Sequence, residues 1–361
     1  MIHCPQDVGY AIEKLVDVFK NSALVAGYTE QQIYFSYTRV LKRDANIFEC
    51  NYSNLTELEN LEHLITDNNI KCVITFDMNY PSRALQVLRY AGVSLIISYW
   101  GAKMSSVNSG VKLALKKLEW LLRRYKPDIF VFESEAMRTT ATHGRGVPLG
   151  KTVVIPLGVD TTLFSPTANK QYIYNTLQIP SSRSVVFYSG HMEKRKGVDV
   201  IIRAAIDLIE NKKFKDVHFV ICGNRPGEEI PYMEMLDGLS AVNHVTFGGY
   251  RSDIPLLMQS STIGVLASTG WDSFTMSSVE MMASGLPLVV SRLQGLAETI
   301  EDGVNGFFFK PGDAHELSQC IHGLLTDRER CELFSKASRS RAEKLFSKDT
   351  QVKGLAALLE D

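Results

Sequence analysis

Short apolar runs alternate with amphipathic stretches along the 361 residues of this chain. An apolar run fits a strand that is buried on both faces, and a helical stretch between two runs supplies the crossover that parallel strands need. The pattern therefore predicts an α/β protein with helices on both faces of parallel sheets. Strands are expected at residues 2–4, 33–37, 72–76, 94–99, 129–132 and 153–156, and again at 185–189, 218–222, 244–247, 262–267 and 287–291.

The length of the chain and one polar stretch indicate two domains. A chain of 361 residues exceeds what a single hydrophobic core comfortably serves. Gly, Asp, Ser, Pro and Asn cluster at residues 158–169, between the two series of apolar runs. We therefore expect an N-terminal domain at residues 1–157 and a C-terminal domain at 158–349, followed by a last helix at about 350–361.

Composition narrows the class of protein. With 45% hydrophobic residues, 22% charged residues and a net charge of −1, the chain lacks the basic excess of a nucleic-acid-binding protein. It shows neither a run of 18 apolar residues nor a signal peptide, which predicts a cytoplasmic protein. The six cysteines form no CxxC pair, so free buried thiols are expected rather than a zinc site or disulfides.

Two acids, Asp272 and Glu280, lie eight positions apart where a strand is expected to pass into a helix. If residues 272–280 were helical throughout, the two carboxylates would lie about 12 Å apart on one side of the helix axis. Such a pair could hold the ribose and the sugar of a nucleotide sugar by their hydroxyl groups, while the helix start between them binds the diphosphate. Two plainer interpretations stay open, because Asp272 is also a good helix N-cap and Glu280 could be a solvated helix residue.

The stretch 268–313 resembles the nucleotide-sugar site of retaining glycosyltransferases of family 4, in which an acid is followed seven residues later by Glu and then by a small-residue–Gly–x–Pro helix end. Four further segments resemble that family in the same order, at residues 153–166, 188–205, 244–261 and 302–313. The resemblance implies the GT-B fold, in which two doubly wound, Rossmann-like domains face each other across a cleft. It also implies an acceptor-side N-terminal domain, on which the last helix packs, and a C-terminal domain that binds the nucleotide sugar.

The resemblance assigns roles to residues of the C-terminal domain. Glu280 would bind the donor ribose. Asp272, which stands where Glu is usual, would bind a hydroxyl of the donor sugar, and Lys196 would bind the diphosphate. Asp272 and Lys196 would thus be the catalytic residues. Further donor contacts are expected at the start of the helix, at the nucleobase and after the first strand, namely Phe274, Thr275, Met276, Tyr250 with Arg251, and Gly9.

Two positions depart from the family pattern. His191 stands where the family has an arginine, so Arg195 or Lys194 would share the binding of the diphosphate. Cations that precede a helix oppose its dipole, and a bound anion would remove that conflict, although a solvated basic turn explains them as well. Trp100 ends an expected strand where the family often has a histidine; it could stack on a sugar of the donor or acceptor, or belong to the core.

The segment 111–126 predicts a helix with two different faces. One face is an apolar stripe that is expected to pack on the sheet, formed by Val111, Ala114, Leu115, Leu118, Leu121, Leu122 and Tyr125. The opposite face places Leu113 and Trp120 among Lys112, Lys116, Lys117, Arg123 and Arg124. An exposed apolar pair within a basic face is typical of a helix on anionic lipid, so Leu113, Lys116 and Trp120 are expected to contact a membrane. A solvated charged face is the alternative.

The resemblance implies a retaining transferase that needs no metal and no cofactor, and the sequence has no obvious DxD cluster. Its substrate would be a UDP- or GDP-sugar, and its acceptor the hydroxyl of a glycan or of a lipid-linked molecule in the synthesis of bacterial cell-surface glycans or glycolipids. The protein would then work in the cytoplasm, with peripheral contact at the inner face of the membrane. Three alternatives stay open: a nucleotide-sugar 2-epimerase, a phosphorylase-like enzyme with a pyridoxal cofactor, and a degenerate binding module without turnover.

Overall fold

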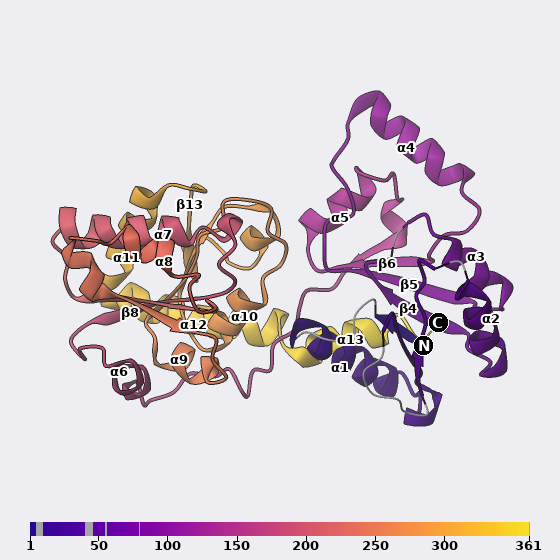
Figure 1. Ribbon diagram of the computed structural model, residues 1–361, viewed down its shortest axis with the longest axis horizontal. Coiled ribbons are helices and arrows are strands. Elements are labelled where there is room, and N and C mark those ends of the chain that lie inside the picture. Colours follow the sequence, from indigo (N-terminus) through magenta and orange to yellow (C-terminus); the bar gives the residue numbers. More distant parts are fainter. Residues whose placement is uncertain (5–9, 40–45, 55, 79, 361) are drawn as a thin grey trace. The chain divides into compact units, whose positions relative to one another are not determined.

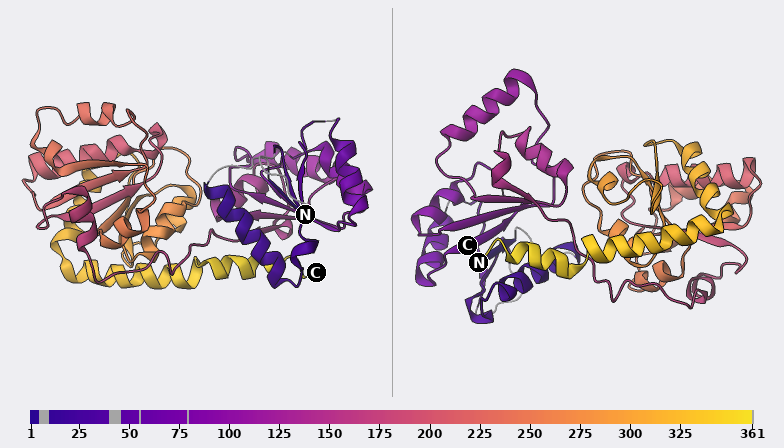
Figure 2. Two further views of the ribbon diagram at one scale, coloured as in Figure 1. Left: turned by 60° about the horizontal axis from the view of Figure 1, so that its bottom comes forward. Right: turned by 180° about the vertical axis from the view of Figure 1, so that it is seen from behind.

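The computed structural model describes residues 1–4, 10–39, 46–54, 56–78 and 80–360, and the chain divides into two compact units (Figure 1). Unit 1 comprises Met1–Pro156 and Asp349–Asp361, and unit 2 comprises Leu157–Lys348. Within the described residues, each unit is built around one parallel sheet with helices packed on it (Figure 2). The predicted α/β class is therefore confirmed.

Unit 1 has a sheet with the strand order β3-β2-β1-β4-β5-β6-β7 in the part of the chain that the structure describes. Its strands are β1 (Ile2–Cys4), β2 (Phe35–Tyr37), β3 (Ile47–Glu49), β4 (Cys72–Phe76), β5 (Leu95–Trp100), β6 (Ile129–Phe132) and β7 (Thr152–Val154). Its helices are α1 (Tyr10–Val25), α2 (Leu58–Asp67), α3 (Arg83–Tyr90), α4 (Gly110–Leu122), α5 (Glu135–Thr142) and α13 (Lys348–Ala356), of which Lys348 belongs to unit 2.

The core of unit 1 joins the beginning and the end of the chain. The ring of Phe19 on α1 lies 4.8 Å from the ring of Phe76 and 5.2 Å from that of Tyr99. Val352 and Leu355 of α13 belong to the same buried cluster. Burying apolar side chains from residues 349–361 explains why this segment is part of unit 1 although it follows unit 2 in the sequence.

Unit 2 has a sheet with the strand order β10-β9-β8-β11-β12-β13. Its strands are β8 (Ser184–Ser189), β9 (Val217–Cys222), β10 (Val245–Gly249), β11 (Ile263–Leu266), β12 (Leu288–Ser291) and β13 (Gly306–Phe309). Its helices include α6 (Gln171–Leu177), α7 (Val198–Ile206), α8 (Ile230–Glu234), α9 (Ile254–Ser260), α10 (Met276–Ala283), α11 (Ala314–Thr326) and α12 (Arg328–Leu345). Every residue of β9 and β11 is buried, which is why these strands appear as unbroken apolar runs in the sequence.

The strand orders define where each sheet binds ligands. In unit 2, β8 and β11 are neighbours although they are not consecutive, so the chain leaves them toward opposite sides of the sheet. Ligands of open parallel sheets bind at the carboxyl ends of the strands at such a switch point. The segments after β8 and β11 are therefore the candidate site of unit 2. In unit 1 the switch point lies between β1 and β4; Gly9, which was predicted to contact the donor, lies outside the described residues.

The orientation predicted for α4 is wrong. Trp120 is only 6% exposed, and its ring lies 5.5 Å from that of Tyr80 and 5.8 Å from that of Phe130. Leu113 and Lys116 are half-buried on the same side. Figure 1 shows α4 standing out from the strands of unit 1, so the opposite stripe has no sheet to pack on. The indole is buried because Tyr80 and Phe130 offer it an aromatic pocket, and the predicted membrane contact through Leu113, Lys116 and Trp120 does not hold.

Candidate functional site

The two segments at the switch point of unit 2 are locked together by backbone contacts. Gly197 adopts a left-handed conformation at the N-cap of α7, with φ of 69°. A Cβ atom at this position would lie 1.8 Å from the carbonyl oxygen of Ala267, so no side chain fits there. The amide of Thr269 donates to the carbonyl of Arg195 at 2.7 Å. The segment after β11 thus lies directly on the turn before α7.

Lys196 and Asp272 form an ion pair between these two segments. The Lys196 ammonium lies 2.9 Å from Oδ1 and 3.0 Å from Oδ2 of Asp272, and the hydroxyl of Ser268 donates to Oδ2 at 2.5 Å. The side chains are 14% and 6% exposed, respectively. The guanidinium of Arg195 lies farther away, 3.7 Å from Oδ1. Removing one partner of a buried pair costs about 3–5 kcal/mol, because the other charge is left uncompensated.

The structure excludes helix capping as the role of Asp272. Helix α10 begins at Met276 after the N-cap Thr275, three residues beyond Asp272. Residues 272–275 are not helical, so the distance of about 12 Å that assumes one continuous helix does not apply. The carboxylate is instead bound by Lys196 and Ser268.

Glu280 lies on α10 and is buried, with 6% of its surface exposed, so the interpretation as a solvated residue is wrong. A glutamate is rarely buried on a helix whose neighbouring residues, here Val279 and Met282, belong to the core. Burial of such a side chain requires polar or charged partners. The start of the same helix is fixed to the sheet, because the Ser277 hydroxyl donates to the carbonyl of Ser189 at the end of β8 at 2.8 Å. Helix α10 thus presents its N-terminus at the switch point.

Phe274, Thr275 and Met276 form the entry to α10. The ring of Phe274 is buried and lies 5.1 Å from the ring of Phe346, so this residue can meet a ligand only through its backbone. The first N–H groups of an α-helix have no partner within the helix and favour an anion. The Phe274 side chain therefore anchors the segment, while the backbone around Thr275 remains available for binding.

The basic turn Lys194–Lys196 consists of residues in different surroundings. Lys194 and Arg195 are exposed, and the Arg195 guanidinium donates to Glu193 at 2.6 Å and to the carbonyl of Trp271 at 3.1 Å. His191 is exposed, and its carbonyl accepts a hydrogen bond from the Tyr188 hydroxyl at 2.8 Å. A solvated basic turn describes Lys194, whereas the half-buried Lys196 is committed to Asp272.

A hollow of about 700 Å³ lies at the carboxyl ends of β9 and β10. It is lined by Asn224, Arg225, Pro226, Glu229, Gly249 and Tyr250. Tyr250 is 73% exposed, whereas the guanidinium of Arg251 is bound by both oxygens of Asp253 at 2.7 Å. Asn224 braces the hollow by accepting from the Gly249 amide at 2.9 Å and donating to Glu229 at 3.0 Å. Asn224 and Glu229 were not predicted, although they follow an apolar run in the same way as the residues after β8.

In unit 1 the structure corrects one prediction and adds two acids. Trp100 is buried, and its Nε1 donates to the Ser98 hydroxyl at 2.9 Å, so it is a core residue rather than an exposed stacking platform. At the ends of the neighbouring strands, Glu133 accepts from the Tyr99 hydroxyl at 2.9 Å, and Asp77 accepts from the Gly101 amide at 2.9 Å. Burial raises the pKa of Glu133 to about 8. Neither acid was predicted.

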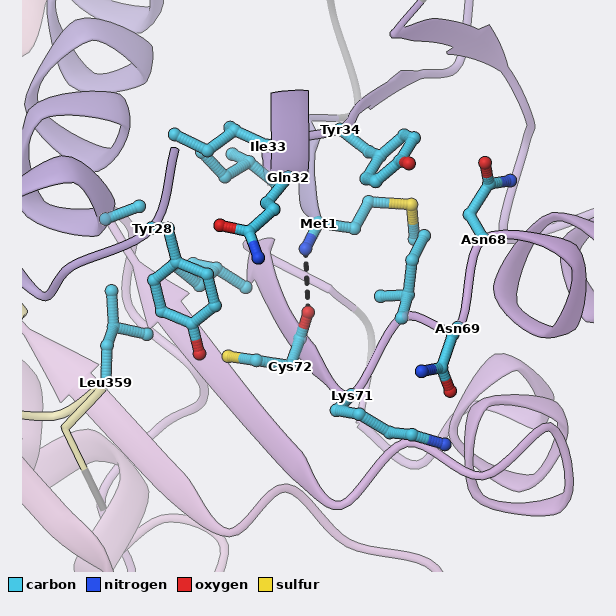
Figure 3. Close-up of a pocket in the computed structure, with 14 residues that line it drawn as sticks. Met1, Tyr28, Gln32, Ile33, Tyr34, Asn68, Asn69, Lys71, Cys72 and Leu359 are labelled. Atoms are coloured by element: carbon cyan, nitrogen blue, oxygen red, sulfur yellow. Dashed lines mark hydrogen bonds between the residues drawn. The ribbon is translucent and has the colours of Figure 1, made fainter. Parts of the chain in front are cut away.

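A cavity of about 270 Å³ in unit 1 lies at the opposite edge of its sheet, where the strands begin (Figure 3). It is formed where β1 and β4 begin, and the amino group of Met1 donates to the carbonyl of Cys72 at 2.7 Å. Its lining is largely apolar, with Tyr28, Ile33 and Leu359 around it. Because ligands of parallel sheets bind at the carboxyl ends of the strands, this cavity is not a candidate for the predicted nucleotide site.

The described residues also show the state of the cysteines, the grouping of possible metal ligands and the character of the helices. All six cysteines are free thiols, and Cys4, Cys50 and Cys222 are buried, which raises the pKa of each to about 12. No three His, Cys, Asp or Glu side chains gather as metal ligands in the ranges that the structure covers. Among the same residues no helix has both the length and the apolar character needed to cross a bilayer.

Comparison with known proteins shows what unit 2 is similar to. Residues 170–341 match the family model of glycosyl transferases group 1. The chain is 29% identical over 185 residues to the D-inositol 3-phosphate glycosyltransferase of Corynebacterium aurimucosum and 30% identical over 186 residues to spore coat protein SA of Bacillus subtilis. These matches span 49% of this chain and 44% and 49% of the two relatives, so the chain spans about half the length of the curated relatives that it matches.

A longer match and two solved structures extend the comparison over both units. The UDP-Gal:alpha-D-GlcNAc-diphosphoundecaprenol alpha-1,3-galactosyltransferase of Escherichia coli is 24% identical over 332 residues, which cover 90% of this chain and 83% of that protein. A glycosyltransferase from Rickettsia africae has a TM-score of 0.84 with 18% identity, covering 100% of this chain and 98% of its own. HepE of Anabaena, solved in complex with UDP, has a TM-score of 0.79 with 18% identity, covering 99% and 98%.

These likenesses confirm the predicted fold, two Rossmann-like domains of the GT-B class. The switch point of unit 2, with Lys196, Asp272 and Glu280, lies inside the segment that the family model matches. Residues 170–341 of unit 2 are therefore similar to glycosyl transferases group 1.

Proposed function

We propose that the chain is a retaining glycosyltransferase, similar to those of family 4, that moves a sugar from a nucleoside-diphosphate sugar to an acceptor hydroxyl. The observation that carries this proposal is the Lys196–Asp272 ion pair, which lies at the switch point of unit 2 before the start of α10. An arrangement of a cation, an acid and a free helix start suits a ligand that carries both a diphosphate and hydroxyl groups.

Each part of the donor has a proposed partner in unit 2. Glu280 binds the ribose, the backbone from Phe274 to Met276 and Lys196 bind the diphosphate, and Asp272 binds a hydroxyl of the sugar. The base enters the hollow beside Tyr250. We propose a UDP- or GDP-sugar as donor; the Escherichia coli relative is named for UDP-Gal and the Anabaena structure holds UDP, which favours UDP.

The charge around the diphosphate supports a reaction without a metal or cofactor. The exposed Lys194 precedes α7, where its charge opposes the helix dipole by about 0.3–1 kcal/mol, whereas Asp272 and Glu193 already offset the charges of Lys196 and Arg195. A bound diphosphate removes this conflict and gains the N–H groups of α10. His191 contributes a hydrogen bond in place of the family's arginine.

In the proposed reaction, the bond between the anomeric carbon and the phosphate oxygen breaks, and a bond to the acceptor oxygen forms on the same face of the sugar. The acceptor proton passes to the departing phosphate. Lys196 and the start of α10 stabilise the negative charge that develops on this phosphate, which is the electrostatic contribution that usually dominates catalysis. Asp272 positions the sugar, and no side chain acts as a nucleophile.

The acceptor is assigned to unit 1. The end of β4 carries the exposed Asp77, an acid suited to the hydroxyls of a glycan or of a lipid-linked acceptor, whereas Tyr99 and Glu133 at the ends of β5 and β6 are buried. Gly9 is proposed to contact the donor through its backbone. We further propose that the protein acts in the cytoplasm in the synthesis of cell-surface glycans or glycolipids.

A second candidate function is binding of a nucleotide sugar without turnover. It is favoured by the engagement of Asp272 with both Lys196 and Ser268, which occupies the acid that the transfer reaction needs for the sugar. Isothermal calorimetry with UDP and GDP, combined with a turnover assay on their glucose and galactose derivatives, distinguishes the two. Tight binding without release of nucleoside diphosphate would favour the binding protein.

The direct test of the transferase is a thermal-shift screen with UDP-, GDP- and ADP-sugars followed by product analysis. A donor at a hundred times its dissociation constant should raise the stability by about 2.7 kcal/mol. Incubation of that donor without an acceptor provides a control, since conversion to an epimeric sugar would identify a 2-epimerase instead.

A further inference from the structure

The outward face of α4 is an apolar stripe on the surface of unit 1. Its residues are Val111, Leu115, Leu118, Leu121 and Leu122, which are 76%, 59%, 52%, 71% and 78% exposed. Spacings of three and four residues place them on one side of the helix. Single exposed apolar residues are normal, whereas five large ones on one helix of 13 residues form a contiguous patch that marks an interaction surface.

The opposite side of α4 holds the helix in this orientation. Trp120 packs between Tyr80 and Phe130, and Lys126 donates to the Trp120 carbonyl at 3.0 Å. The chain at Gly146 passes so close to α4 that a Cβ atom there would lie 2.5 Å from the backbone at Lys116 and Lys117. Turning the apolar stripe inward would expose the indole and break these contacts. The stripe is therefore a stable feature of the surface.

Positive charge borders the stripe. Glu119 forms ion pairs with Lys116 at 2.7 Å and with Arg123 at 2.6 Å. Lys112 and Lys117, which flank the stripe, form no ion pair with any carboxylate in the part of the chain that the structure describes, and both are exposed. The helix thus combines an outward apolar face with lysines at its margins.

A basic hollow adjoins the C-terminal end of α4. It has a volume of about 510 Å³, and its charged lining consists of Arg89, Arg124, Lys126, Lys151 and Asp128. Asp128 pairs with Arg89 at 2.5 Å, which leaves three cations around the hollow without an acid that offsets them in its lining. Trp120 also lines this hollow, so the hollow adds positive charge near the end of the helix but is not part of the outward stripe.

We propose that the outward face of α4 docks this protein on the surface of an anionic lipid bilayer. The five apolar side chains enter the boundary between head groups and acyl chains, while Lys112 and Lys117 bind lipid phosphates. A second copy of this chain is a poorer partner for the stripe, because pairing two such faces brings their flanking lysines together. The proposal concerns attachment alone and stands independently of the reaction assigned to the protein.

The test is sedimentation of the full chain with vesicles of phosphatidylcholine, with and without phosphatidylglycerol, at low and high ionic strength. The wild-type protein should bind the anionic vesicles at low salt and be released at high salt. Leu115→Ser with Leu118→Ser should weaken binding roughly tenfold or more, because two exposed apolar side chains are lost from the contact. Lys112→Gln with Lys117→Gln should weaken it roughly tenfold as well.

Leu333→Ser is the matched control, since Leu333 is an exposed leucine on α12 in unit 2. This variant should bind vesicles as the wild type does, and all variants should keep the wild-type melting temperature, because the substituted side chains are exposed. The proposal is overturned if the wild type fails to bind anionic vesicles at low ionic strength, or if the double leucine variant binds them equally well. Sedimentation velocity that shows a dimer lost in the leucine variant, without vesicle binding, would assign the stripe to a second copy.

Discussion

The carboxyl-terminal edges of the two sheets hold buried acids in opposite electrostatic surroundings. In unit 2, Asp272 lies 2.9 Å from the ammonium of Lys196. In unit 1, Glu133 lies 2.9 Å from the neutral hydroxyl of Tyr99, and burial raises its pKa to about 8. Both acids follow strands of parallel sheets, but Asp272 is bound by a cation and a hydroxyl, whereas Glu133 is bound by the hydroxyl of Tyr99.

This difference shows how one architecture can serve two kinds of ligand. A cation beside an acid, close to a helix start, suits a charged diphosphate next to sugar hydroxyls. An acid that retains its proton near neutral pH can donate a hydrogen bond to a neutral hydroxyl, as an acceptor would require. Unit 2 would then bind the donor and unit 1 the acceptor.

The largest effect is expected at Lys196. Lys196→Ala should lower turnover by about 10²–10³-fold, because it removes the charge that stabilises the leaving phosphate. It should also lower the free energy of unfolding by about 3–5 kcal/mol, since Asp272 is then buried without its partner. Turnover with the best donor and chemical denaturation are the two measurements.

A double variant separates these two effects. Lys196→Ala with Asp272→Asn removes both charges of the pair, so it should recover most of the lost stability while remaining inactive. If Lys196→Ala keeps the turnover of the wild type, the lysine does not bind the diphosphate. The difference between the surroundings of Asp272 and Glu133 would then have no bearing on catalysis.

Glu133 should make unit 1 lose stability as the pH rises. Between pH 4.5, the ordinary pKa of a glutamate, and about 8, the unfolded chain loses the proton while the folded protein retains it, which favours unfolding. Glu133→Gln keeps an acceptor for Tyr99 but cannot ionise, so at pH 8 it should be more stable than the wild type by about 2–4 kcal/mol. Below pH 4.5 the wild type and Glu133→Gln should have the same melting temperature. If their melting temperatures differ by the same amount at every pH from 4.5 to about 8, Glu133 is not held in its protonated form.

Glu280 should affect the binding of the nucleotide. Glu280→Gln should weaken the binding of nucleoside diphosphates by about 1.5–3 kcal/mol, which is typical of a hydrogen bond to a charged group. Calorimetry with UDP and GDP measures the change, and a melting curve checks that the buried position tolerates the amide. Affinities equal to those of the wild type would contradict the assignment of the ribose to this residue.

Central strands could be predicted from the sequence more fully than side-chain contacts. Strands β4 and β6 lie at the predicted residues because buried central strands are continuous apolar runs. β3 and β13 were missed because short edge strands, half exposed, leave a weaker pattern. The orientation of α4 was predicted wrongly because Tyr80 and Phe130, remote in sequence, decide which face is buried.

The candidate site was predictable by residue type but not by geometry. Lys196 and Asp272 were each singled out, yet their ion pair joins residues 76 positions apart, which no local spacing indicates. The contact between Tyr99 and Glu133 spans 34 positions and follows from the pairing of β5 with β6. Such contacts depend on how the strands are ordered in the sheet, and the apolar runs that predict the strands do not contain this information.

The smallest effect is expected at Tyr250, whose ring is exposed beside the hollow at the ends of β9 and β10. Stacking of an aromatic side chain on a base is worth about 1–3 kcal/mol, and a largely exposed ring should lie at the lower end. Tyr250→Ala should therefore weaken UDP or GDP binding about fivefold without changing the melting temperature, since the ring contributes little to the core. Tyr250→Phe should bind as the wild type does, because the ring is retained. If both variants bind UDP and GDP like the wild type, the base does not stack on this ring, and the hollow at β9 and β10 would have to bind it through Asn224 and the backbone alone.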